Sequence, residues 1–274
     1  MSVCQIGDGD GDGCAMAVDW QLRESGPTDA EHTVLLLPGG MCSAGSYAEV
    51  MAQSALAHTH LVAATLPGQA GAPSPDDHSV EGYARHVAEL ATRLGADAVV
   101  GFSMGAVVAV EMVTSGSYRR PVVLLGVSLS PKDEPAFFRA IIRSTSVLGN
   151  LPMKVLAAGA GSMVKRIPAS PERQAQLRED FRRNRPRDMW LGLRAYLRWL
   201  QRHEGRAERL CEAGVPMWIV HAEKGDSGLD ERRALDACLH AHVVTVPGAV
   251  FFLPSEIPER IAEFIGEALA VVHS

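Results

Sequence analysis

The sequence has few cysteines and no long apolar run, and each shortage argues against a class of protein. Its five cysteines are odd in number, and no two have Cys-x-x-Cys spacing, which argues against a disulfide framework or a zinc site. No stretch approaches the roughly 18 apolar residues of a membrane span. The amino-terminal residues also lack the basic patch and apolar block of a signal peptide. We therefore expect a cytoplasmic protein, and nothing in the sequence indicates a metal or an organic cofactor.

The alternating Gly and Asp residues at 7–13 resemble part of a calcium-binding repeat. They lack the later bidentate glutamate of an EF-hand loop, and one short copy cannot build a repeat fold. We expect residues 1–14 to form a flexible amino-terminal tail.

Short apolar runs bounded by glycine or proline recur along the chain, and they indicate strands buried on both faces. They occupy residues 33–40, 60–68, 97–103, 121–130, 216–223 and 242–248. Between the second and third runs, residues 79–95 place their apolar side chains on one stripe, with Ser79 as the expected N-cap and Gly95 as the expected stop. Alternating strands and helices predict an α/β fold, a mostly parallel central sheet flanked by helices. Ligands on such sheets bind at the carboxyl ends of the strands.

Residues 136–214 interrupt this alternation, because they contain helical patterns and no strand-like run. They predict a helical cap inserted before the last two strands, with residues 15–135 and 215–274 forming the core. The segment carries sixteen basic and seven acidic residues, a net +9, whereas the rest of the chain carries −15. The ordinary interpretation of such a charge run is a helical face exposed to solvent. The more specific interpretation is a cap that attracts an anionic ligand or an acidic carrier protein. The acidic chain, without aromatic–basic interleaving, argues against nucleic acid.

The motif with the most chemical content is Gly101-Phe102-Ser103-Met104-Gly105, between a predicted strand and a predicted helix. A serine on a sharp strand-to-helix turn needs a backbone conformation that is unfavourable for side-chain-bearing residues. Its neighbours two positions away must be very small to avoid the helix and the adjacent strand. Such a turn exposes the serine hydroxyl beside the free N–H groups of the new helix.

With this motif the chain resembles the α/β-hydrolase superfamily of the cap-domain type, from about residue 15 to 272. The resemblance implies that Ser103 is a nucleophile. Residues 35–47 are similar to the oxyanion-hole loop of the family, with Pro38-Gly39-Gly40 where His-Gly is usual. The backbone N–H groups of Gly40, or alternatively Met41, and of Met104 would then form the oxyanion hole.

The same resemblance offers two candidates for the acid of a catalytic triad. Residues 216–228 are similar to the strand that ends in this acid, which implies the role for Asp226; a solvated loop carboxylate is the competing interpretation. Asp133 is the alternative, because some members carry the acid one strand earlier.

The histidine of the triad is where the sequence departs from the family. Members usually have Gly-x-Gly-His followed by an aromatic residue after the last strand, and here Phe251 occupies the place of the histidine. Phenylalanine cannot accept a proton, and a serine hydroxyl is a poor nucleophile without a base. No other histidine is well placed to replace the missing base. We expect His58, His60, His240 and His242 at the wrong end of the sheet and a structural role for His221. His78 and His203 could reach the site only if the chain folds favourably.

Three hypotheses follow from the sequence. The first is a serine hydrolase acting on an ester or thioester, with a small acyl or apolar substrate. The second is a lyase, isomerase or cyclase that uses the oxyanion hole for an enolate. The third is a non-catalytic protein in which Phe251 and Phe252 fill an apolar ligand pocket under the cap; Phe102 joins these two as a candidate substrate-binding residue. Fold alone does not choose among them.

Overall fold

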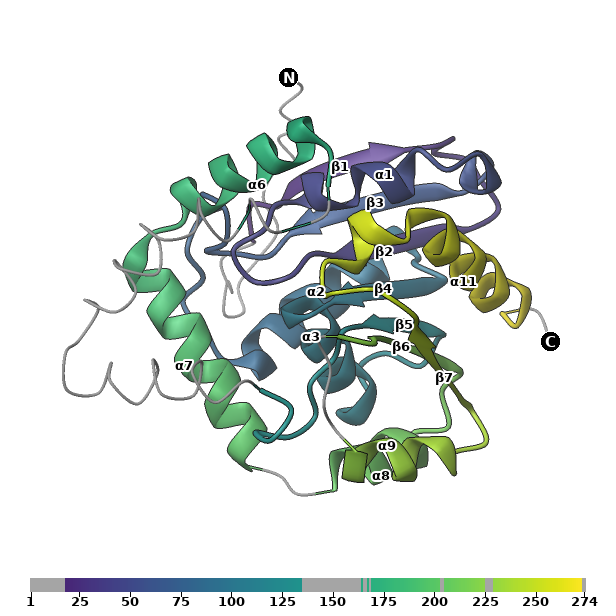
Figure 1. The fold of residues 1–274 in the computed structure, drawn as a ribbon. Coiled ribbons are helices and arrows are strands. Elements are labelled where there is room, and N and C mark those ends of the chain that lie inside the picture. Colours follow the sequence, from purple (N-terminus) through teal and green to yellow (C-terminus); the bar gives the residue numbers. More distant parts are fainter. Residues whose placement is uncertain are drawn as a thin grey trace, which may run out of the picture.

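The computed structural model describes residues 18–134, 164, 167, 169–202, 205–224 and 229–272. Within this part of the chain, seven strands form one sheet in the order β1-β3-β2-β4-β5-β6-β7 (Figure 1). The strands are β1 (Gln21–Ser25), β2 (Thr33–Leu37), β3 (His60–Thr65), β4 (Ala98–Phe102), β5 (Val122–Leu125), β6 (Met217–Ala222) and β7 (Ala241–Val246). Strands β2 to β7 are parallel, and β1 pairs antiparallel with β3 at the edge. The mostly parallel α/β sheet predicted from the sequence is confirmed.

Strand β1 has no counterpart in the sequence prediction. Its sequence QLRES is polar, and its three central residues are exposed. Edge strands need no apolar run, because one side and much of each face remain in solvent. The pairing of Gln21 to Ser25 with Thr65 to Leu61 is a long-range contact that the local pattern does not reveal.

In the described part of the chain, helices lie between these strands and after the last one. They are η1 (Ala44–Tyr47), α1 (Ala48–Met51), η2 (Ser54–Leu56), α2 (Val80–Leu94), α3 (Met104–Thr114), α6 (Pro171–Arg183), α7 (Pro186–Arg202), α8 (Arg206–Glu212), α9 (Leu229–Asp236), α10 (Leu253–Glu256) and α11 (Pro258–Ala270). Helix α2 confirms both predicted ends. The Ser79 hydroxyl accepts a hydrogen bond from the Gly82 N–H at 2.9 Å, and Gly95 has the left-handed φ of 62° that suits glycine.

The sheet is buried on both faces, because successive strand residues point to opposite sides. Leu35 and Leu37 belong to a first core formed with α2, α3, α7 and α8, which contains Trp199. Val34 and Leu36 belong to a second core formed with α1, α6 and α11, which contains Trp218. The doubly buried sheet explains why the sequence of β2 is a continuous apolar run.

Between β5 and β6 the described residues contain the helices α6 to α8 and no strand, so the helical insertion before the last two strands is confirmed. Helices α6 and α7 form an extended arm on one side of the domain (Figure 1). The predicted tail at 1–14, the first part of the predicted cap at 136–163, His203 and Asp226 all lie outside the described residues. No helix among the described residues is long and apolar enough to cross a membrane.

Candidate active site

Ser103 lies on a one-residue turn between β4 and α3. Its φ is 50° and its ψ is −112°, a conformation that a side-chain-bearing residue rarely adopts. Its N–H donates to the Leu125 carbonyl of β5 at 2.9 Å, which ties the turn to the neighbouring strand. The Ser103 hydroxyl does not cap α3, and no described residue forms a hydrogen bond with it. The hydroxyl is thus held at the amino terminus of a helix and left available.

The two flanking glycines are required by backbone contacts. A Cβ atom added at Gly101 would lie 2.5 Å from the backbone nitrogen of Ala106. A Cβ atom added at Gly105 would lie 2.3 Å from the carbonyl oxygen of Leu37. Backbone atoms cannot rotate away as side chains do, so the glycine spacing predicted from the sequence has a direct steric cause.

The loop after β2 lies against this turn. A Cβ atom added at Gly39 would lie 3.4 Å from the Cβ of Ser103, and one added at Gly40 would lie 3.7 Å from the Cβ of Met104. Within the described part of the chain, neither the Gly40 N–H nor the Met104 N–H has a hydrogen-bond partner. The free N–H groups of Gly40 and Met104 therefore belong to two residues that lie next to each other in space, beside Ser103.

Met41, the third candidate for an oxyanion donor, is engaged elsewhere. Its N–H donates to the side-chain oxygen of Gln69 at 2.7 Å. Its φ of 67° is another left-handed conformation for a residue other than glycine. Gln69 is 5% exposed and belongs to the loop after β3. No local sequence pattern indicates this contact between the two loops.

Phe251 lies at the same edge of the sheet as Ser103. Its ring centroid is 5.3 Å from that of Phe102, the residue before Ser103. A Cβ atom added at Gly126, directly after β5, would lie 3.9 Å from the Phe251 ring. Phe251 is 44% exposed, whereas Phe102 and Phe252 are buried at 1% and 5%. Of the three phenylalanines predicted to bind a ligand or substrate, Phe251 alone presents a substantial surface.

The turn that carries Phe251 is held by a single carboxylate. Glu256 accepts hydrogen bonds from the N–H groups of Val250, Phe251 and Phe252 at 2.7, 3.0 and 2.6 Å. Hydrogen bonds to an ionised acceptor are stronger than neutral ones. The backbone at position 251 is therefore well fixed, although the ring is half exposed.

Asp133, the alternative triad acid, holds its own loop. Its carboxylate accepts from the N–H groups of Leu129 and Ser130 at 2.9 and 2.8 Å. The adjacent Glu134 accepts from Ser128 at 2.7 Å and from the Tyr196 hydroxyl. These contacts give Asp133 a structural role in the loop after β5.

The histidines lie where the strand directions place them. His60 begins β3 and pairs with Glu24 at 3.2 Å, and His242 stacks on Trp218 near the start of β7; both are at the amino ends of the strands. His78 is on the carboxyl side, where its Nε2 lies 3.3 Å from a carboxylate oxygen of Asp188 on α7. His221 is half buried near the end of β6. No described histidine forms a hydrogen bond with Ser103.

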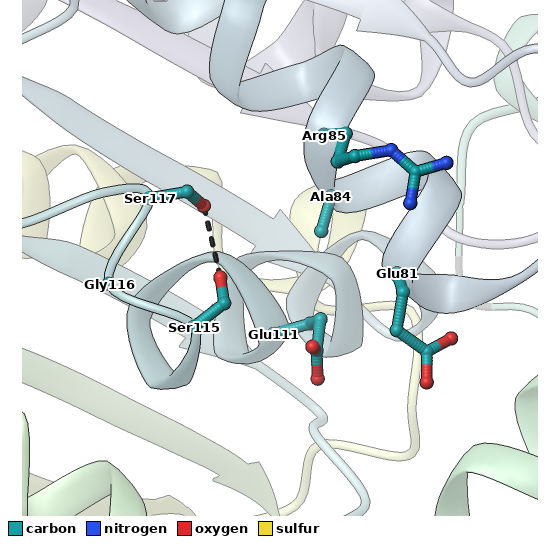
Figure 2. A pocket seen from close by; sticks show the side chains of 7 residues that line it. All are labelled: Glu81, Ala84, Arg85, Glu111, Ser115, Gly116 and Ser117. Atoms are coloured by element: carbon teal, nitrogen blue, oxygen red, sulfur yellow. Dashed lines mark hydrogen bonds between the residues drawn. The ribbon is translucent and has the colours of Figure 1, made fainter.

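A cavity of about 330 Å³ lies at the other end of α3 (Figure 2). It is lined by Glu81, Ala84, Arg85, Glu111, Ser115, Gly116 and Ser117. Ser115 follows the carboxyl terminus of α3, whereas Ser103 precedes its amino terminus. An α-helix of 11 residues spans about 16 Å, so this cavity is not part of the candidate site.

Residues 34–263 match the model of the alpha/beta hydrolase family. The chain belongs to this family. No curated protein sequence matches it. The membership accounts for the mostly parallel seven-stranded sheet flanked by helices in this alpha/beta hydrolase.

Proteins of known structure that share this architecture are named as enzymes of different types. A thermophilic esterase from Thermogutta terrifontis is 18% identical with a TM-score of 0.73, covering 94% of this chain and 95% of that one. The enol-lactonase from Burkholderia xenovorans is 16% identical with a TM-score of 0.73, covering 93% and 98%. A haloalkane dehalogenase variant from Bradyrhizobium elkanii is 19% identical with a TM-score of 0.70, covering 94% and 95%. At these identities the likeness establishes the fold of this alpha/beta hydrolase and leaves its substrate open.

Proposed function

We propose that this alpha/beta hydrolase is a serine hydrolase of the ester or thioester type, with Ser103 as its nucleophile. The observation that carries the proposal is the backbone of Ser103, whose φ of 50° is unfavourable for serine. Such strain costs of order 1–3 kcal/mol and is concentrated at functional sites. The turn leaves the hydroxyl without a partner among the described residues, so no described protein group competes with a substrate for the Ser103 oxygen.

The N–H groups of Gly40 and Met104 support an oxyanion hole beside this hydroxyl. In the proposed step, Ser103 Oγ attacks the carbonyl carbon and the carbonyl π electrons move to the oxygen, which accepts hydrogen bonds from the two amides. Collapse of this intermediate expels an alcohol or a thiol, and water then cleaves the acyl-serine to release the acid. The Met41 N–H is not part of the proposed oxyanion hole, because it already donates a hydrogen bond to the Gln69 side chain.

The proposal has no histidine base, so the Ser103 proton passes to solvent. Without its base, a triad enzyme keeps only a ~10³–10⁴-fold acceleration over water. Substrates with good leaving groups are therefore favoured, and thioesters fit well, because a thiol with a pKa of about 8.5 leaves without a proton donor. The net +9 of residues 136–214 supports an anionic acyl substrate.

For the acid we propose Asp226, because Asp133 is engaged by backbone N–H groups. With phenylalanine at position 251, neither carboxylate has an imidazole to orient. We expect Asp226→Asn to change the rate less than threefold, in contrast to a complete triad, where loss of the acid costs about 10⁴-fold.

The alternative function is non-hydrolytic, and the Phe251 turn favours it. A half-exposed aromatic ring replaces the base, and its backbone is fixed by the three hydrogen bonds to Glu256. This arrangement supports apolar ligand binding, or a lyase, isomerase or cyclase that needs oxyanion donors and no acyl-enzyme.

The test is labelling with a fluorophosphonate probe, with the modified residue located by mass spectrometry. Modification of Ser103 that is lost in Ser103→Ala supports the hydrolase. Absence of labelling in the natural chain, with labelling in Phe251→His, means that the turn is competent and the base is missing, which favours the non-hydrolytic alternative. Absence of labelling in both chains refutes Ser103 as a nucleophile.

A further inference from the structure

Helix α6 presents a polar face to the loop after β2. Four residues spaced by three or four positions share this face: Arg173, Gln176, Asp180 and Asn184, the last being the residue that ends the helix. Asp180, Asn184 and Arg173 are 0%, 6% and 7% exposed. Buried polar side chains must find hydrogen-bond partners, and here the partners lie on the loop beside Ser103.

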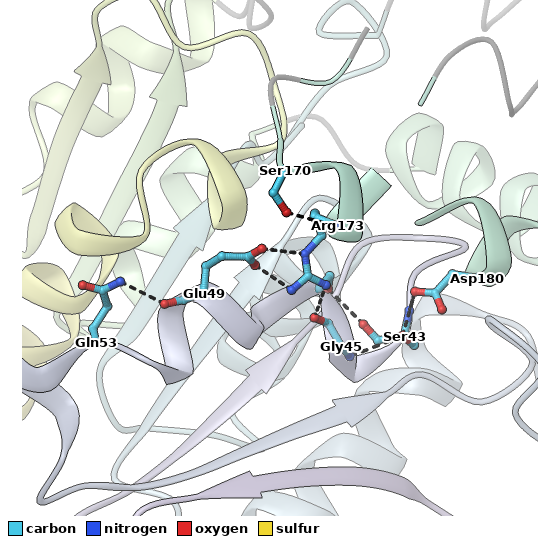
Figure 3. A network of polar contacts seen from close by, with 8 residues as sticks. Ser43, Gly45, Glu49, Gln53, Ser170, Arg173 and Asp180 are labelled. Atoms are coloured by element: carbon cyan, nitrogen blue, oxygen red, sulfur yellow. Dashed lines mark hydrogen bonds and ion pairs between the residues drawn. The ribbon is translucent and has the colours of Figure 1, made fainter. Parts of the chain in front are cut away.

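Two of these residues hold the segment after the loop (Figure 3). The Asp180 carboxylate accepts from the N–H and the hydroxyl of Ser43 at 2.9 and 2.7 Å. Arg173 pairs with Glu49 at 2.7 Å and donates to the carbonyl of Gly45. The start of η1 and the helix α1 are thereby attached to α6.

Asn184 reaches further, to the two left-handed residues of neighbouring loops. Its side-chain nitrogen donates to the Met41 carbonyl at 2.9 Å, and its side-chain oxygen accepts from the Ala70 N–H at 2.9 Å. Met41 has a φ of 67° and Ala70 a φ of 45°. The Met41 N–H is held by Gln69, so hydrogen bonds fix the backbone on both sides of Met41.

Gly40, directly before Met41, carries the free N–H that the proposed function places in the oxyanion hole. We propose that Asn184 is a positioning residue, which holds the Met41 backbone so that the Gly40 N–H lies beside the Met104 N–H. Helix α6 then couples the cap to the reacting centre: while α6 is docked, the loop keeps the conformation that the reaction needs. The catalytic part of this inference rests on the proposed function, whereas the positioning of the loop does not.

Two variants separate the contacts that Asn184 makes. The side-chain nitrogen that donates to the Met41 carbonyl also donates to the Asp180 carbonyl within α6, at 2.7 Å. Asn184→Asp keeps the size and the oxygen that faces the Ala70 N–H, but replaces the donor to the Met41 and Asp180 carbonyls by an oxygen. Asn184→Ala removes all three contacts. Arg178→Ala is the matched control on α6, because Arg178 is exposed and, among the described residues, donates only to Gln174, at 3.2 Å.

The first measurement is amide hydrogen exchange of the full chain, which needs no catalysis. We expect Asn184→Asp to accelerate exchange about tenfold in residues 39–45 and to leave residues 68–72 unchanged. Asn184→Ala accelerates both segments, and Arg178→Ala accelerates neither. Equal exchange in the natural chain and both Asn184 variants overturns the proposal. Acceleration spread evenly over the whole cap also overturns it, because that result means a general loss of stability.

The second measurement is hydrolysis of p-nitrophenyl acetate, with Ser103→Ala as the blank. We expect Asn184→Asp to lower kcat by about 10- to 100-fold at unchanged KM, because the loss falls on transition-state stabilisation. Unchanged kcat alongside faster loop exchange refutes the coupling to catalysis. If the natural chain shows no activity above the blank, the proposed function fails on its own, and hydrogen exchange still decides whether Asn184 positions the loop.

Discussion

Returning a histidine to position 251 is the sharpest perturbation of the site. Phe251 is 44% exposed, so it buries about 110 Å² of the roughly 200 Å² of a phenylalanine, worth about 3 kcal/mol at 25 cal/mol per Å². The imidazole ring of a histidine at position 251 would still pack against Phe102, so only part of this buried area would be lost. We expect Phe251→His to lower the free energy of unfolding by about 1–2 kcal/mol, which the fold tolerates.

The rate gain is expected to be much larger than this loss. A positioned general base typically contributes 10²–10⁴-fold, so we expect kcat/KM for p-nitrophenyl acetate to rise by at least 10² in Phe251→His. The gain appears as the imidazole loses its proton, so the rate rises with pH around about 6.5 and then levels off. The assay is initial-rate hydrolysis from pH 5 to 8, with unfolding in urea measured in parallel.

Two controls isolate the base. Phe251→Ala opens the site without adding a base, and we expect it to raise the rate less than threefold. The double variant Phe251→His with Ser103→Ala should return to the blank. A folded Phe251→His protein with no increase in rate would refute the inference that position 251 faces Ser103. Equal activity in the double variant would show that the new histidine acts without Ser103.

Three further outcomes are expected. Gly105→Ala, whose Cβ would lie 2.3 Å from a β2 carbonyl oxygen, should cost about 3 kcal/mol or more in urea unfolding, whereas Gly266→Ala, open on α11, should be neutral or stabilise by up to about 1 kcal/mol. Ser79→Ala removes the N-cap of α2 and should cost about 1 kcal/mol; an unchanged thermal midpoint would contradict that role. Burial, with the Asp180 carboxylate adding to it, raises the pKa of the Cys42 thiol, so the folded chain keeps a proton that the unfolded chain loses above about pH 8.5. Between pH 8.5 and 10 the free energy of unfolding should therefore fall by up to about 1.4 kcal/mol per pH unit from Cys42, and Cys42→Ala should remove this part of the slope.

The strand positions and the Ser103 turn could be predicted because their causes are local. A strand buried on both faces requires a continuous apolar run, and the turn requires glycine at positions 101 and 105 for steric reasons. Strand β1 escaped prediction because an edge strand needs neither feature. The sequence likewise predicted the two ends of α2 from Ser79 and Gly95.

The polar contacts that shape the site could not be predicted, because they join distant segments. Gln69 meets Met41 across 28 positions, and Asn184 meets Met41 across 143. Nothing near Met41 in the sequence indicates that its N–H is occupied. The spacing of Arg173, Asp180 and Asn184 places them on one face of a helix, but nothing in the sequence indicates what that face packs against.

The two cores on opposite faces of the sheet carry separate optical reporters. Trp199 is 1% exposed in the first core, and Trp218 is 3% exposed in the second. Fluorescence of chains that retain one tryptophan or the other therefore follows the melting of each face individually. Because every central strand contributes side chains to both faces, the two emission curves should coincide, and the domain should melt as one cooperative unit.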